Sequence, residues 1–213
     1  MKIKNAIICA AGLGSRLGLD MPKCLVPIGN KPLIFHLLKA LEDVPNVRIV
    51  VGFKEDEVIK YVKSIRPDVV FVRNPNYFTT TNAYSLYLGS HDLSEPFLNI
   101  DGDMYITKEN LQLFENKIIE NQDLIGYTKS YTEDAVFVRL DEHSNVVEFN
   151  RDKISDYEWT GIAYFANVKI QSEGKYIYQE LERILPIKAC EVICYEIDTP
   201  QDLEFVMGQI NIG

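Results

Sequence analysis

An apolar strand that runs directly into a glycine loop is the feature that most restricts how this 213-residue chain can fold. Residues 6–9 read Ala-Ile-Ile-Cys, and the segment that follows contains Ala10, Ala11, Gly12, Gly14 and Ser15. Glycines and small residues at the end of a strand let backbone N–H groups approach an anionic ligand. The loop therefore predicts a strand followed by a phosphate-binding turn.

Two cations follow the loop at fixed spacing. Arg16 comes directly after it, and the Pro22-Lys23 pair places an ammonium seven residues further along. The loop lacks the Gly-Lys-Ser/Thr ending of a Walker motif, and Leu17 stands where a dinucleotide fingerprint needs its third glycine. The pattern Gly-x-Gly-x-Arg with a Pro-Lys pair is thus neither of the two common glycine loops.

This pattern resembles that of nucleotidyltransferases, which join a nucleoside triphosphate to a phosphorylated small molecule and release pyrophosphate. The resemblance implies that the loop wraps the triphosphate. It also implies that Arg16 and Lys23 are the catalytic groups, neutralising charge on the α-phosphate and on the leaving group. For the glycine loop alone, a tight turn without a ligand is the alternative.

Strands and helices are expected to alternate along the first hundred residues. Apolar spacing predicts strands at 2–9, 47–52, 69–72 and 96–100, and helices at 31–42, 55–65 and 82–88. This order favours an α/β fold with a mainly parallel, twisted, Rossmann-like sheet and helices on both faces. Ligands of such sheets bind at the carboxyl ends of the strands.

The second half of the chain predicts a different arrangement. Strands are expected at 124–129, 135–140, 146–150, 160–166 and 192–194, most of them separated by charged turns. The first four of these favour a small antiparallel extension that covers the acceptor side of the cleft. Residues 1–213 are expected to form a single domain, because no linker or repeat interrupts them.

Acidic residues follow two of the expected strands. Asp101 and Asp103 flank a glycine after residue 100, and Asp198 follows the strand expected at 192–194. Carboxylates at strand ends suit Mg²⁺, which usually takes one or two of them together with substrate phosphates. The resemblance implies that Asp103 and Asp198 hold this metal and that Asp101 lies beside the nucleotide. A polar turn, and a helix cap at Thr199, are the alternatives.

A donor-rich loop leads into the helix expected at 82–88. The resemblance implies that this loop lies over the nucleobase, which makes Thr81, Asn82 and Ser85 nucleotide-binding candidates. Capping of the helix explains Thr81 or Asn82 equally well.

Three features narrow the resemblance to one group of nucleotidyltransferases. They are the run Asn-x-Tyr-Ser-Leu-Tyr-Leu at 82–88, the short spacing from Arg16 to Lys23 and the ending Tyr-Glu-Ile-Asp-x-x-Gln-Asp. Together they are most similar to bacterial choline-phosphate cytidylyltransferases of lipopolysaccharide and teichoic-acid decoration, over nearly the whole chain. The resemblance implies CTP as the nucleotide and phosphocholine or a related phosphorylated amine as the acceptor. A homodimer is left open.

Aromatic, acidic and basic residues are the candidates to bind the acceptor. They are Tyr84, Lys129, Lys153, Trp159, Tyr195 and Glu196. Trp159, the single tryptophan, is expected to stack on a quaternary ammonium, with packing in the core as the alternative. One departure from the family pattern is that its Glu-Trp pair before a middle strand is replaced here by Glu133-Asp134, while Glu158-Trp159 lies later.

Composition excludes several other roles. A net charge of −9 argues against nucleic acid as a partner, because binding a polyanion needs a basic surface. Apolar runs are only strand-sized, which argues against membrane insertion, and the start of the chain leads straight into the first strand, which favours a cytoplasmic protein. The spacing of the four cysteines fits no zinc site and favours buried, reduced thiols.

Two other functions compete with a cytidylyltransferase. A sugar-1-phosphate nucleotidyltransferase that uses UTP, dTTP or GTP would keep the same loop and metal residues. A non-catalytic nucleotide sensor would need neither both metal aspartates nor Lys23, so their joint presence favours an enzyme.

Overall fold

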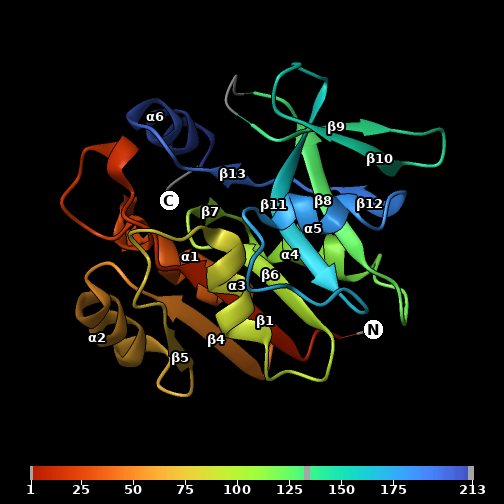
Figure 1. Cartoon of the computed structure of the whole chain (residues 1–213). Coiled ribbons are helices and arrows are strands. Elements are labelled where there is room, and N and C mark those ends of the chain that lie inside the picture. Colours follow the sequence, from red (N-terminus) through yellow and green to blue (C-terminus); the bar gives the residue numbers. More distant parts are fainter. Residues whose placement is uncertain (1, 132–134, 211–213) are drawn as a thin grey trace.

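A single nine-stranded sheet runs through the molecule, with helices packed on both of its faces (Figure 1). The computed structural model describes residues 2–131 and 135–210. The sheet has the order β5-β4-β1-β6-β11-β8-β12-β10-β9. Its strands are β1 (Asn5–Ala10), β4 (Asn46–Val51), β5 (Val70–Arg73), β6 (Phe97–Asp101), β8 (Leu124–Lys129), β9 (Phe137–Leu140), β10 (Asn145–Asn150), β11 (Tyr157–Phe165) and β12 (Ile187–Glu191).

The first half of the sheet is parallel, as the alternation of strands and helices predicts. Strand β1 pairs in parallel with β4 on one side and with β6 on the other, and β5 continues beyond β4. The chain then reverses, because β11 pairs antiparallel with both β6 and β8, and β9 and β10 form an antiparallel pair at the far edge. The expected antiparallel extension is therefore the other end of the same α/β sheet.

Alternating side chains of β1 divide the core into two layers. Ile8 packs into a cluster that contains Leu37 of α1 (Leu33–Ala40), together with residues of α2 (Glu55–Ile65) and α4 (Lys108–Glu115). Ile7 points to the opposite face, where Leu86 of α3 (Asn82–Ser90) and Leu181 of α5 (Ile177–Glu182) pack. Both isoleucines are fully buried. Because successive side chains of a strand face opposite sides, one strand anchors helices on both faces.

Two short strand pairs complete the fold beside the main sheet. Strand β7 (Met104–Tyr105) pairs antiparallel with β13 (Tyr195–Glu196), and β2 (Pro27–Ile28) pairs with β3 (Lys31–Pro32). The last helix, α6 (Pro200–Gln209), packs over this region in a third apolar cluster that includes Val206 and Ile197. The β7–β13 pair therefore connects the middle of the chain to its C-terminal part.

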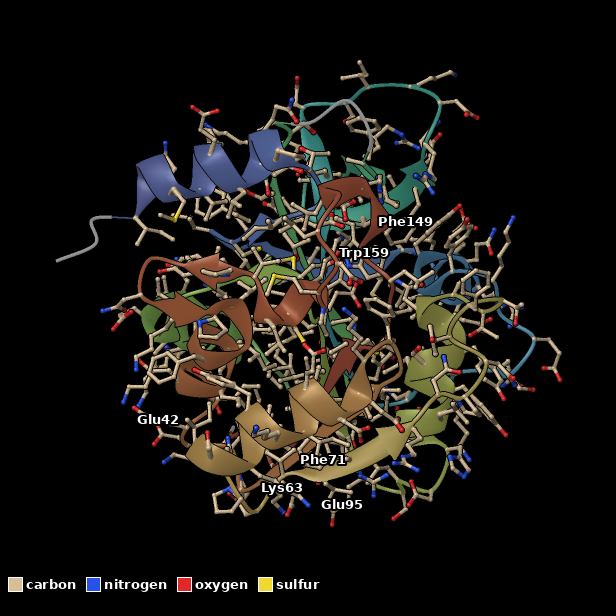
Figure 2. The ribbon with its side chains drawn as sticks, turned by 90° about the vertical axis from the view of Figure 1, so that its left-hand side faces the viewer. Glu42, Lys63, Phe71, Glu95, Phe149 and Trp159 are labelled. Carbon is tan, nitrogen blue, oxygen red and sulfur yellow. The ribbon has the colours of Figure 1, made fainter. Side chains whose placement is uncertain are left out.

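Two details differ from the expectations. The strand near the C-terminal part is Ile187–Glu191 rather than 192–194, although Val192 continues its direction with an N–H bond to the Tyr127 carbonyl at 2.8 Å. Trp159 lies inside β11 instead of before it, next to Phe149 at the antiparallel end of the sheet (Figure 2). Residues 133 and 134 lie outside the described part of the chain.

The four cysteines are free thiols, with Cys24 and Cys194 buried and Cys9 and Cys190 partly buried. Burial raises the pKa of Cys24 to about 12, which keeps that thiol protonated. Within the described residues, no helix has both the length and the apolar character that crossing a bilayer requires.

A candidate active site

The glycine loop connects β1 to two short 3₁₀ turns that carry the two cations. Arg16 lies in the turn Ser15–Leu17 and Lys23 in the turn Lys23–Leu25. Gly14 has a φ of 61°, and a Cβ atom built there would lie 2.7 Å from Cγ of Lys23. A side chain at position 14 would therefore strain the backbone and displace the lysine, so the glycine sets the path of Lys23 as well as the turn.

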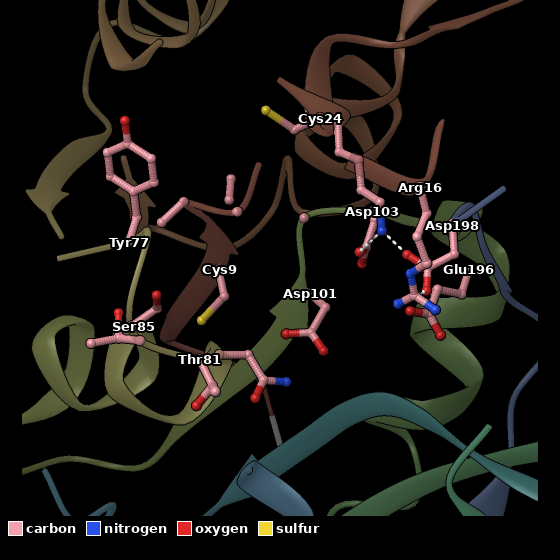
Figure 3. Close-up of a pocket in the computed structure, with 17 residues that line it drawn as sticks. Cys9, Arg16, Cys24, Tyr77, Thr81, Ser85, Asp101, Asp103, Glu196 and Asp198 are labelled. Carbon is pink, nitrogen blue, oxygen red and sulfur yellow. Dashed lines mark hydrogen bonds and ion pairs between the residues drawn. The ribbon is translucent and has the colours of Figure 1, made fainter. Parts of the chain in front are cut away.

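A cavity of about 260 Å³ lies at the carboxyl ends of the parallel strands (Figure 3). The expected site residues that line it are Ala10, Ala11, Gly12, Arg16, Lys23, Thr81, Asn82, Ser85, Asp101, Asp103 and Asp198. Residues that sequence reasoning did not single out also contribute, among them Cys9, Tyr77 and Thr80. The structure thus brings most of the nucleotide, catalytic and metal candidates into one pocket.

Three carboxylates gather at one end of this pocket. Asp103, Glu196 and Asp198 each offer an oxygen, and these oxygens lie within 4.8 Å of one another. Asp103 follows β6, whereas Glu196 and Asp198 come from β13 and the residues after it. Glu196, which the sequence analysis assigns to the acceptor, also belongs to this cluster, because its position two residues before Asp198 on an extended segment gives both side chains the same face.

The two cations of the loop bind the same carboxylates. Lys23 Nζ donates to Asp103 Oδ2 at 2.7 Å and also bonds Asp198 Oδ1, while Arg16 Nη2 lies 2.5 Å from Asp198 Oδ2. The side chains of Lys23, Asp103 and Asp198 are each exposed by only 13–20%. Positive and negative groups are therefore concentrated at this end of the cavity.

The carboxylate cluster fits a hard divalent cation. Asp103 Oδ1 is buried and has no hydrogen-bond partner among the described residues, so a carboxylate oxygen remains available for a ligand. Carboxylate oxygens are the ligands that Mg²⁺ and Ca²⁺ take in proteins. Desolvation, followed by the charge of Asp103, raises the pKa of Glu196 to about 7. Such mutual repulsion of carboxylates is what a bound cation relieves.

The opposite end of the pocket is formed by the loop before α3 and the first turn of that helix. Figure 3 shows Tyr77, Thr81 and Ser85 across the pocket from the three carboxylates, with Asp101 between the two ends. Thr81 is the N-cap of α3 but makes no side-chain capping bond, and its hydroxyl instead bonds the carbonyl of Lys175. The capping alternative therefore does not account for the Thr81 side chain.

A second cavity of about 210 Å³ adjoins the first. Both cavities are lined by Arg16, Asn82, Asp101, Glu196 and Asp198. The second adds Trp159 and Glu158 of β11 and the aromatic rings of Tyr176 and Tyr178, which stack at 5.7 Å between centroids. Nε1 of Trp159 is buried without a hydrogen-bond partner among the described residues. This cavity combines aromatic surfaces with carboxylates at the edge of the phosphate-binding pocket.

Four expected acceptor residues lie elsewhere. Tyr84 packs on Tyr87 along α3, and Tyr195 packs against other aromatic rings beside α6. Lys129 lines a separate hollow, and Lys153 is an exposed residue of the turn after β10. None of the four lines either cavity as described, so the structure does not support them as acceptor ligands. Aromatic or basic character alone does not distinguish an acceptor ligand from a residue that packs elsewhere or lies at the surface.

The backbone of β11 makes the connection between the two cavities. Gly161 interrupts the strand with a φ of 76°, and a Cβ atom there would lie 3.0 Å from Asp101 Oδ2. The glycine therefore lets β11 approach the carboxylate that lies between the phosphate end and the aromatic cavity. No sequence motif indicated this contact, because it joins residues sixty positions apart.

Proteins of known function resemble this chain. It is 29% identical over 168 residues to the 2-aminoethylphosphonate cytidylyltransferase of Lancefieldella rimae, which covers 76% of this chain and 67% of that protein. Of several other curated relatives it spans less than half the length. Its fold superimposes on the CTP:phosphocholine cytidylyltransferase LicC of Streptococcus pneumoniae with a TM-score of 0.80 and 25% identity, over 97% of this chain and 99% of that one.

The inositol-1-phosphate CTP transferase of T. maritima gives a TM-score of 0.78 at 20% identity, over 99% of this chain and 97% of that one, which shows a shared fold. Residues 6–150 match the family described as the MobA-like NTP transferase domain. The matched segment includes the glycine loop, both cations and Asp103, and it covers more than half of the chain. The protein belongs to the MobA-like NTP transferase family.

Proposed function

We propose that this nucleotidyltransferase transfers CMP from CTP to a small phosphorylated amine and releases pyrophosphate in a Mg²⁺-dependent reaction. The observation that carries the proposal is the shared wall of the two cavities. A phosphate-binding pocket with three carboxylates and two cations opens, through Arg16 and Asp101, into a cavity with aromatic rings and carboxylates. A donor and an acceptor can therefore meet with their phosphates side by side.

The reaction needs alignment rather than a general base. A phosphate oxygen of the acceptor attacks the α-phosphorus of CTP, a new P–O bond forms, and the bond to the β-phosphate oxygen breaks to release pyrophosphate. Arg16 and Lys23 bind the phosphate oxygens that gain negative charge in this step. A Mg²⁺ ion on Asp103, Glu196 and Asp198 would neutralise phosphate charge. Backbone N–H groups of the glycine loop bind the remaining phosphates.

The second cavity matches the chemistry of an amine acceptor. The rings of Trp159 and Tyr178 can attract a cation, and the carboxylates of Glu158 and Glu196 complement its charge. The Tyr176 ring already has Arg151 and Lys175 over it. The curated relative named for 2-aminoethylphosphonate and the neighbouring structure named for phosphocholine both take acceptors with an amine and an acidic phosphorus group. These likenesses support CTP and a phosphorylated or phosphonylated amine.

The test is pyrophosphate release with Mg²⁺ and CTP, UTP, dTTP or GTP, crossed with phosphocholine, phosphoethanolamine, 2-aminoethylphosphonate and glucose-1-phosphate. We expect turnover with CTP and at least one amine, and none with glucose-1-phosphate. Turnover with a sugar phosphate instead would keep the loop and carboxylate assignments and overturn the acceptor. Absence of turnover with every pair would contradict the proposal as a whole.

Trp159 provides a second test of the same proposal. Trp159→Leu removes the aromatic face and should raise the KM for the amine by about tenfold, while the KM for CTP stays near that of the wild type. Phe149→Leu is the matched control, because Phe149 packs edge-on against Trp159 and does not line the cavity. Equal effects of both substitutions on the KM for the amine would assign Trp159 to packing alone.

A further inference from the structure

Two of the three carboxylates come from β13 and the residues directly after it, and the ladder of β13 is only two residues long. Its pairing with β7 is limited to Tyr195 with Tyr105 and Glu196 with Met104. A two-residue pair is marginal by itself, so other contacts must fix this segment. The backbone N–H groups on either side of the ladder show which contacts do so.

Three successive N–H groups of this segment have three different partners. The N–H of Ile197 donates to the Asp103 carbonyl at 3.0 Å, which ties the segment to the turn that holds Asp103. The N–H of Asp198 donates to Asp202 Oδ2 at 3.1 Å, within the cap of α6. The N–H of Glu196 donates to the hydroxyl oxygen of Tyr131 at 3.3 Å. Only the bond to Asp202 is local in sequence; one of the other two reaches the turn after β6, and the other reaches the loop after β8.

The Tyr131 hydroxyl lies along the edge of β13 that β7 leaves open. It donates to the Cys194 carbonyl at 3.4 Å while it accepts from the Glu196 N–H. In an extended chain the carbonyl of one residue and the N–H two residues later point to the same side, where a neighbouring strand would bind them. One hydroxyl group therefore bonds the two backbone groups that a third strand would otherwise pair with.

Aromatic packing holds this hydroxyl in place. The Tyr131 ring stacks on Phe205 of α6, at 5.8 Å between centroids and 20° between planes, and lies 5.9 Å from the ring of Tyr195. Desolvation raises the pKa of Tyr131 well above its usual range, so the hydroxyl keeps the proton that it donates to Cys194. Tyr131 itself is 38% exposed, so its ring lies at the surface and not in the core.

We propose that Tyr131 is a positioning residue, whose hydroxyl fixes β13 so that Glu196 and Asp198 converge with Asp103 on the cation. This inference rests on the proposed function for the identity of the cation and goes beyond it in assigning a residue outside both cavities. Tyr131 lines neither cavity, and its hydroxyl acts through the backbone of Cys194 and Glu196.

The experiment compares the wild type with Tyr131→Phe, which keeps the ring against Phe205 and removes only the hydroxyl. Binding of Mn²⁺ alone is measured by isothermal titration calorimetry, beside thermal unfolding in EDTA and the dependence of pyrophosphate release on Mg²⁺. We expect Mn²⁺ to bind about tenfold more weakly and the Mg²⁺ requirement to rise by a similar factor, because residues that orient metal ligands have effects of this size. The kcat at saturating Mg²⁺ and the Tm in EDTA should stay near the wild-type values.

Tyr61→Phe is the matched control, because Tyr61 lies on α2 and lines neither cavity. Equal Mn²⁺ affinity of Tyr131→Phe and the wild type would overturn the positioning role and leave the proposed function intact. A parallel fall in Tm and in Mn²⁺ affinity would likewise overturn it, since it would assign Tyr131 to stability in general. A wild-type protein that binds no Mn²⁺ would overturn the cation site and this proposal together.

Discussion

Lys23 forms ion pairs with the carboxylates, follows a path that the glycine loop allows and has a proposed role in catalysis. Its ammonium bonds Asp103 and Asp198, and Gly14 leaves the space through which its side chain passes. The same ammonium is expected to bind phosphate oxygens during transfer. The residue thus balances the carboxylates in one state and the phosphates in another, which a side chain with a flexible stem and a rotating donor can do.

Lys23→Met should lower kcat by about 10²–10³-fold, the range observed when one group that stabilises transition-state charge is removed. The variant should also unfold at lower temperature in EDTA and recover in Mg²⁺, because the cation replaces the missing positive charge. At this chain length each ~1 kcal/mol corresponds to about 2–4 °C. Pyrophosphate release and thermal unfolding measure the two effects. Lys39→Met is the control, since Lys39 is 61% exposed and pairs only with Glu42.

For single residues, the sequence predicts those that follow strands, but it does not predict those that come together only in the tertiary structure. Arg16, Lys23, Asp103 and Asp198 all line the first cavity, as their positions in the glycine loop and after strands indicate. Their individual roles remain proposals. Tyr176 could not be found in this way, because it reaches the second cavity from the start of α5, which carries no motif.

The loop before α3 closes the end of the first cavity where we propose that the nucleobase binds. Asn74, only 1% exposed, organises it: its Nδ2 donates to the hydroxyls of Thr80 and Ser85 at 3.0 Å each, and its Oδ1 accepts from the Asn76 N–H. Because Ser85 accepts from this amide, its own hydrogen is available to donate into the pocket. One buried amide thereby sets the loop and the polarity of a pocket hydroxyl.

Asn74→Ala should therefore destabilise the protein by about 1–3 kcal/mol, since it leaves buried groups without partners. The KM for CTP should rise by a larger factor than the KM for the acceptor. Urea unfolding and substrate titrations provide the two measurements. Asn76→Ala, an exposed amide two residues away, should change neither quantity. A rise in both KM values by the same factor would show that the loop does not act on the nucleotide specifically.

Element boundaries could be predicted where periodicity is simple. Helix α2 begins and ends as expected, and β1, β4 and β6 come within a few residues, since each has a continuous apolar pattern. β12 was misplaced because its Lys188 and Glu191 are exposed at the surface, whereas Val192 and Cys194 beyond its end are buried and resemble a strand. The sequence places the beginning of β11 too late, because the acidic residue Glu158 interrupts the apolar pattern even though it is buried.

The whole molecule contributes to one site. Arg16 and Lys23 come from its first segment, Asp103 from the middle of the chain, and Glu196 and Asp198 from the last segment before α6. Ligands that connect these segments should therefore stabilise the fold as a unit. Topology of this kind, with a sheet that changes from parallel to antiparallel at β11, does not follow from local sequence patterns.

We expect the Mg²⁺ complex of CTP, as one ligand at about 100 times its Kd, to raise the free energy of unfolding by about 2.7 kcal/mol. This corresponds to about 5–10 °C in Tm for a chain of this length. Asp103→Asn should abolish the part of the increase that depends on Mg²⁺ and leave a smaller increase with CTP in EDTA. Differential scanning calorimetry with and without EDTA distinguishes the two parts. An undiminished Mg²⁺ effect in this variant would remove Asp103 from the cation site.

The order in which the site residues occur along the chain also matters while the protein is being made. The glycine loop, both cations and Asp103 are synthesised early, but Glu196 and Asp198 are among the last residues before α6. A nascent chain that has only completed the parallel strands can expose the glycine loop before Glu196 and Asp198 exist. If these two carboxylates take part in the proposed reaction, activity can begin only after the ribosome has added the β13 segment.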